Sequence, residues 1–96
     1  MKTRILLADD HMVMRSGLRM VLEKNEDLEV VGEADDGRQA VRLAEELRPD
    51  VVVIDIAMPQ LNGIEATRQI MSAAPKTSVV ILSMHADEGY VMRALK

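Results

Sequence analysis

Short apolar runs alternate with amphipathic segments along the whole chain. Residues 4–8, 51–54 and 78–82 are rich in Ile, Val and Leu, and residues 28–34 alternate weakly between apolar and polar side chains. Such runs predict β-strands, the weakly alternating one at an edge of the sheet. The segments between them carry apolar residues at helical spacing, each with one buried stripe. The stripes are Met14, Leu18, Val21 and Leu22 in residues 11–25; Ala40, Val41, Ala44 and Leu47 after Asp36; and Ile70, Met71 and Ala74 before Pro75.

Capping and helix-breaking residues mark the ends of these helices. Asp36 and Asn62 precede the second and third helical segments and are placed to cap them. Arg48-Pro49-Asp50 ends the second segment, and Pro75 ends the third, because a proline biases the preceding residue away from helical geometry.

The last segment continues the alternation. Asp87 is placed to cap a fourth helix with Val91, Ala94 and Leu95 on one face, and the chain stops inside that helix at Lys96. Strands that alternate with helices predict parallel pairing with right-handed crossovers. We therefore expect one α/β domain over residues 1–96, truncated within its fourth helix.

Polar side chains follow three of the predicted strands. Val51 to Ile54 is an unbroken apolar run, typical of a strand buried on both faces, and it ends at Asp55. Asp9 and Asp10 close the first strand, and Ser83 closes the strand at 78–82. In a parallel sheet these ends share one edge, where open α/β folds bind their ligands. Carboxylates that converge there repel one another, and a hard cation such as Mg²⁺ would remove the repulsion.

Each of these residues also has an ordinary structural interpretation. Aspartate at a strand end is common turn chemistry, and Ser83 alone would be a hydrogen-bonded loop residue. The joint pattern of an acidic pair, a lone aspartate and a hydroxyl favours a functional site. His11 opens a helix beside two carboxylates, and we expect it to be a local hydrogen-bonding residue. His85 is expected in an exposed loop.

Composition narrows the class of protein. The chain has 96 residues, 48% of them apolar, no cysteine and one aromatic residue, Tyr90. It therefore forms no disulfide and offers no thiolate. A net charge of −4 gives it no electrostatic reason to bind nucleic acid, which would require a basic face. No apolar run is long enough to cross a bilayer.

Three motifs resemble the receiver domain of bacterial two-component response regulators. They are Leu6-Leu7-Ala8-Asp9-Asp10-His11, Val52 to Pro59 followed by Asn62-Gly63, and Val80 to His85. The sequences of two further segments are most similar to those of regulators with a LuxR-type helix-turn-helix output domain. These segments are Arg15-Ser16-Gly17-Leu18 and Val31-Gly32-Glu33-Ala34.

The resemblance implies a flavodoxin-like doubly wound sheet with strand order 2-1-3-4. It also implies that Asp55 accepts a phosphoryl group from a sensor histidine kinase. Asp10, Asp55 and the main-chain carbonyl of Ala57 would bind Mg²⁺, Asp9 would hold a metal-bound water, and Ser83 would be the switch hydroxyl. Such a protein is cytoplasmic, is no enzyme beyond its own phosphorylation and dephosphorylation, and reaches DNA only through an output domain.

The chain departs from the family at its C-terminal end. The family's fifth strand, which ends in a Lys, and its fifth helix have no counterpart in these residues, and Lys96 falls in the predicted fourth helix. We therefore expect a shortened form of the domain. The strand at 78–82 would then be a bare sheet edge, which predicts a homodimer or aggregation.

Three other functions compete with this interpretation. A haloacid-dehalogenase-like phosphatase would need a second aspartate where Ala57 stands. A flavin-binding domain would need a hydroxyl- and glycine-rich loop after the first strand and aromatic side chains. A non-phosphorylated pseudo-receiver, used only for binding, would not need the full set of Asp9, Asp10, Asp55 and Ser83.

Overall fold

The computed structural model describes residues 2–55 and 61–82, and the backbone of 91–94. A single sheet has the order β2-β1-β3-β4-β5, in which β1 to β4 are parallel and β5 runs antiparallel to β4. The predicted order 2-1-3-4 and the edge position of β2 are therefore confirmed, and the flavodoxin-like α/β class with them. The elements are β1 (Thr3–Ala8), α1 (Met12–Glu23), β2 (Leu28–Ala34), α2 (Gly37–Leu47), β3 (Val51–Asp55), α3 (Gly63–Ala73), β4 (Ser78–Leu82) and β5 (Val91–Ala94).

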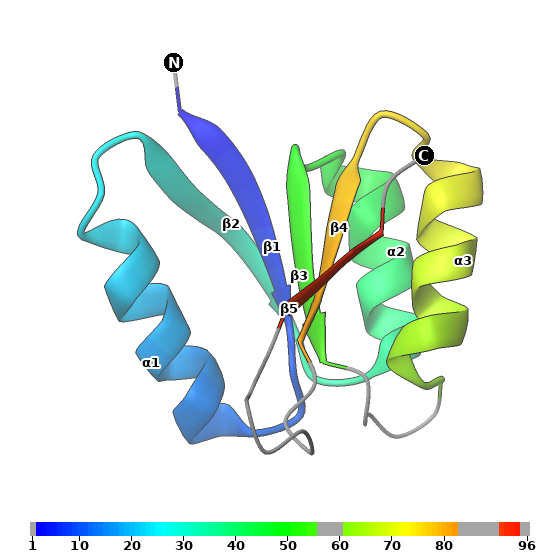
Figure 1. Cartoon of the computed structure of the whole chain (residues 1–96), viewed down its shortest axis with the longest axis horizontal. Coiled ribbons are helices and arrows are strands. Elements are labelled where there is room, and N and C mark those ends of the chain that lie inside the picture. The colour runs from blue at the N-terminus through cyan, green and yellow to red at the C-terminus, as the bar shows by residue number, and fades with distance from the viewer. Residues whose placement is uncertain (1, 56–60, 83–90, 95–96) are drawn as a thin grey trace.

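Helices cover both faces of the sheet, with α1 on one side and α2 and α3 on the other (Figure 1). Alternate residues of β1 point to the two faces. Leu6 and Ala8 belong to the larger core, which α2 and α3 cover with Ala40, Ala44 and Ile70. Ile5 and Leu7 belong to a smaller core with Val30, against which Leu18 and Leu22 of α1 pack. Burial on both faces explains why the central strands read as continuous apolar runs.

The two predicted helix caps are present. The Asp36 side chain accepts a hydrogen bond of 2.8 Å from the main-chain N–H of Gln39. The Asn62 side chain accepts one of 2.9 Å from the N–H of Glu65. Each bond satisfies a donor that has no partner within its own helix.

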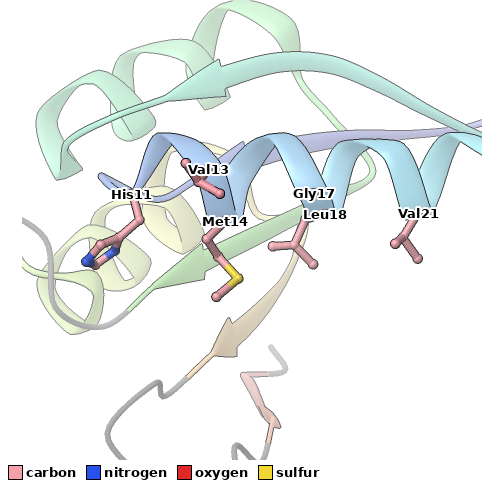
Figure 2. Close-up of a pocket in the computed structure, with 6 residues that line it drawn as sticks. All are labelled: His11, Val13, Met14, Gly17, Leu18 and Val21. Atoms are coloured by element: carbon pink, nitrogen blue, oxygen red, sulfur yellow. The ribbon is translucent and has the colours of Figure 1, made fainter.

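The first helix is the least buried of the elements whose side chains the structure describes. The structure describes all twelve residues of α1, and none of them is buried. Met14, Leu18 and Val21 lie on one face of the helix, and with Gly17 they line a shallow apolar groove that begins at His11 (Figure 2). The predicted buried stripe is therefore wrong for Val21 and Met14, which are 65% and 38% exposed, whereas Leu18 and Leu22 are partly buried and pack against the smaller core.

The predicted fourth helix is wrong where the structure describes it. Residues Val91–Ala94 form a strand that pairs with β4, with Leu82 opposite Val91 and Val79 opposite Ala94. The predicted cap Asp87 lies outside the described residues, as does Leu95. Pairing satisfies the backbone groups along the outer edge of β4, so the expectation of a bare edge there is wrong as well. Antiparallel pairing of β4 with β5 requires only a short connection, whereas a parallel crossover needs about a dozen residues or more.

No membrane-spanning segment is found in the part of the chain that the structure describes. None of its helices combines the length and the apolar character that a bilayer crossing requires.

Candidate functional site

Pairing of β1 with β3 brings the predicted carboxylates together. Ala8 is opposite Ile54, so Asp9 leaves β1 beside the point where β3 ends at Asp55. Asp9, Asp10, His11 and Asp55 each contribute one possible ligand atom, and these four atoms all lie within 4.8 Å of one another. The sequence prediction that these aspartates converge at the carboxyl edge of the sheet is confirmed.

The site is most buried where Asp9 and Asp55 lie. Asp9 is 3% exposed and Asp55 is 1% exposed, whereas Asp10 lies at the surface. The Oδ2 atom of Asp9 is buried and has no hydrogen-bond partner among the described residues. A buried carboxylate oxygen without a donor is costly, and a bound cation would compensate for it. The donor set therefore fits a cation on an observation independent of the sequence motif.

His11 closes the exposed side of this cluster. Its Nδ1 atom lies 2.9 Å from Asp9 Oδ1, 3.1 Å from Asp10 Oδ1 and 3.9 Å from Asp55 Oδ2. Its main-chain N–H also donates to Asp9 Oδ1 over 2.8 Å. The hydrogen bond with Asp9, followed by the charge of Asp10, raises the pKa of His11 above its usual 6.5. The predicted role of His11 as a local hydrogen-bonding residue is confirmed.

Arg15 is a positioning residue that the sequence analysis missed. Its guanidinium donates to the main-chain oxygens of Asp9 and Ala34, and its Nε atom lies 2.7 Å from Glu33 Oε1. These bonds hold the start of α1 against the ends of β1 and β2. The available signal was the helical spacing between His11 and Arg15, which places Arg15 one turn further along the same face.

Two predicted site residues lie outside the described part of the chain. These are Ala57, with its main-chain carbonyl, and Ser83, with its hydroxyl. Ser83 follows Leu82, the residue of β4 that is in register with Asp55.

Oxygen donors dominate the site, and their chemistry indicates the kind of ion. Carboxylates of Asp9, Asp10 and Asp55 form an incomplete shell. Hard divalent cations prefer such donors, and Mg²⁺ in particular keeps waters or phosphate oxygens in its remaining positions. The arrangement can therefore hold a divalent cation among the carboxylates of Asp9, Asp10 and Asp55.

Curated relatives match nearly the whole chain. The transcriptional regulatory protein DegU of Brevibacillus brevis is 43% identical over 95 residues, which are 99% of this chain and 40% of that protein. The transcriptional regulatory protein LiaR of Bacillus subtilis (strain 168) is 46% identical over 88 residues, which are 92% of this chain and 42% of that protein. The chain thus spans about two fifths of the length of these relatives.

Solved structures agree with the sequence relatives. The response regulator domain of Thermotoga maritima CheB has a TM-score of 0.86 and 45% identity, covering 93% of this chain and 66% of that one. A LuxR-family two-component response regulator from Aurantimonas sp. SI85-9A1 has a TM-score of 0.84 and 41% identity, covering 90% of this chain and 61% of that one. The family model described as "Response regulator receiver domain" matches residues 5–96. The chain therefore belongs to the receiver domain family of response regulators.

Proposed function

We propose that this chain is a phosphorylation-controlled switch in which Asp55 accepts a phosphoryl group from a histidine kinase. The observation that carries the proposal is the position of Asp55, which is almost fully buried at the end of β3 and beside Asp9 and Asp10. A nucleophile for phosphoryl transfer must be aligned with the phosphorus and surrounded by groups that neutralise its oxygens. A strand end holds the carboxylate in a fixed orientation.

The transfer step follows from the chemistry of a phosphohistidine donor. A carboxylate oxygen of Asp55 attacks the phosphorus, and the new P–O bond forms as the P–N bond breaks. The electron pair stays with the departing imidazole nitrogen, which takes up a proton. Hydrolysis of the aspartyl phosphate by water later regenerates Asp55 and releases inorganic phosphate. The chain would thus catalyse only its own phosphorylation and dephosphorylation.

We assign the cation to the same carboxylates. Asp10 and Asp55 would bind Mg²⁺ directly with the main-chain carbonyl of Ala57, and Asp9 would hold it through a water. Bound there, the ion would neutralise the phosphoryl oxygens. Ser83 would hydrogen-bond a phosphoryl oxygen and so couple the state of Asp55 to the chain that follows β4.

The wider role rests on the relatives. DegU and LiaR are named transcriptional regulatory proteins, and one solved relative is RcsB from Salmonella enterica bound to a promoter in the presence of a phosphomimetic. We infer a cytoplasmic regulator whose output domain binds DNA. A homodimer stays a prediction, and because β5 covers the edge of β4, it would need another surface.

Acetyl phosphate provides the test. Incubation of the full-length protein with acetyl phosphate and Mg²⁺ should add the mass of one phosphoryl group, and mild base should remove it. Asp55→Asn should abolish the mass gain, because an amide oxygen is too weak a nucleophile. Chelation of Mg²⁺ should slow the reaction strongly, since the carboxylates would then repel the anionic donor.

A matched control separates the site from other carboxylates. Asp35→Asn removes an exposed carboxylate before α2 and should leave the mass gain unchanged. If the wild-type protein takes up no phosphoryl group while it remains folded, the chain is a pseudo-receiver and the proposal fails.

A further inference from the structure

The proposed phosphoryl site needs only oxygen ligands, yet a nitrogen atom lies among them. Nδ1 of His11 belongs to the same group of four ligand atoms as the carboxylates of Asp9, Asp10 and Asp55. The imidazole projects from the first residue before α1 and is 63% exposed, so it can adjust its position without repacking the core.

The spacing of these atoms fits a single octahedral ion. Bonds of about 2.1 Å place neighbouring ligands about 3.0 Å apart and opposite ligands about 4.2 Å apart. Nδ1 lies 2.9 Å from Asp9 Oδ1, with which it forms a hydrogen bond in this structure, and 3.1 Å from Asp10 Oδ1. Both separations match those of neighbouring ligands, so an ion would replace this hydrogen bond. Its 3.9 Å separation from Asp55 Oδ2 falls close to that of opposite ligands. A cation could therefore enter between these groups with small movements of exposed side chains.

A second observation points to a missing ligand. Asp9 is almost fully buried, and its Oδ2 atom has no hydrogen-bond partner among the residues that the structure describes. The other oxygen, Oδ1, already accepts the main-chain N–H of His11. The hydrogen bonds of His11 therefore leave one buried acceptor of Asp9 unsatisfied, and an ion at this position would satisfy it.

Nitrogen ligands change which ion such a site prefers. Mg²⁺ gains little from an imidazole, whereas first-row transition ions such as Co²⁺ and Zn²⁺ bind imidazole strongly. We propose that His11 is a nitrogen ligand that strengthens the binding of a divalent transition-metal ion at the acidic site. The inference rests on the proposed function in so far as the same carboxylates serve both ions.

Binding of metals to the full-length protein tests this directly. Calorimetric titrations with Co²⁺ and with Mg²⁺ would compare the wild type with His11→Asn and with His85→Asn, which alters the other histidine of these 96 residues. His11→Asn should weaken Co²⁺ binding about tenfold or more and change Mg²⁺ binding by less than about threefold. His85→Asn should leave both affinities near the wild-type values.

A spectroscopic readout identifies the ligand without relying on a variant. Pulsed electron paramagnetic resonance of bound Mn²⁺ should show modulation from a directly coordinated imidazole nitrogen in the wild type and in His85→Asn. His11→Asn should lose this signal. Absence of the signal in wild-type protein with Mn²⁺ bound would overturn the inference, as would a Co²⁺ affinity that His11→Asn leaves unchanged.

These results are separable from the fate of the proposed function. A Co²⁺ affinity that depends on His11, in a protein that acetyl phosphate fails to phosphorylate, would support the metal inference and reject the phosphoryl switch. Phosphorylation of Asp55, together with a Co²⁺ affinity that does not depend on His11, would support the phosphoryl switch and reject the metal inference.

Discussion

Glu33 of β2 forms ion pairs with two arginines of α1, and these pairs connect the sheet to that helix near the site. It accepts hydrogen bonds from Arg19 and Arg15 of α1, which lower its pKa from the usual 4.5, with Arg19 as the larger cause. A carboxyl group with a lowered pKa in the folded protein stabilises that state fully above its unfolded pKa. As the pH falls from about 4.5 through the lowered value, this contribution is lost.

Removal of the Glu33 charge should make the stability of the protein depend less on pH in the acidic range. Glu33→Gln should reduce the free energy of unfolding by about 0.5–1 kcal/mol at pH 7, because the ion pairs are partly exposed to solvent. The difference from the wild type should shrink below the lowered pKa of Glu33. Urea denaturation at several pH values measures both effects.

Glu29→Gln is the matched control, since Glu29 is exposed on the same strand, β2. It should change the free energy of unfolding by less than about 0.5 kcal/mol at any of these pH values. A Glu33→Gln deficit that stays constant down to acidic pH would contradict the assigned cause.

Two glycines give opposite predictions for the same substitution. A Cβ atom on Gly37 would lie 1.8 Å from the main-chain oxygen of Leu61, whereas one on Gly17 would meet no atom within 4 Å. Gly37→Ala should therefore cost about 2–3 kcal/mol through overpacking. Gly17→Ala should stabilise α1 by about 0.5–1 kcal/mol through helix propensity. Thermal unfolding of both variants checks the difference in sign, and equal effects would contradict it.

Some features of individual residues could be predicted from the sequence, and others could not. Asp9, Asp10 and Asp55 could be placed together because strand ends of a parallel sheet share one edge. The hydrogen bonds of Arg15 to Asp9 and Glu33 could not be predicted from the sequence, because they depend on the register of β1 with β2. The need for glycine at Gly37 depends on the approach of Leu61, which is distant in sequence.

Among the elements, the caps of α2 and α3 permit a direct prediction. Asp36→Ala and Asn62→Ala should each lower the free energy of unfolding by about 1 kcal/mol, since each leaves a helix N–H without its acceptor. The double variant should lose about twice as much if the two caps act independently. Urea denaturation measures these values. Glu26→Ala, on the exposed turn before β2, is the control and should have little effect.

The elements themselves were largely readable from periodicity. Strands β1, β3 and β4 are continuous apolar runs, and α2 and α3 begin at the expected caps. The strand at residues 91–94 could not be predicted from periodicity, because the spacing of Val91 and Ala94 fits a helix as well as a short strand. A long-range partner, the outer edge of β4, decides the outcome there.

For the molecule as a whole, β5 determines whether the sheet has an open edge at β4. A chain that ends at Tyr90 lacks β5 and should expose the backbone groups of β4. We expect this shorter chain to self-associate at concentrations where the 96-residue chain sediments as a monomer. Sedimentation velocity over a dilution series is the measurement. Identical, concentration-independent sedimentation of the two chains would show that β5 does not protect this edge.

The central position of β1 has a consequence for synthesis on the ribosome. The first strand to be made lies between β2 and β3, and its second neighbour begins only at Val51. While β3 is still inside the ribosome, the side of β1 that will pair with β3 stays without its partner strand. Long-range parallel pairing is also slow to form. The order of translation thus delays the acidic cluster, because Asp9, Asp10 and His11 can meet Asp55 only after β3 has emerged and paired with β1.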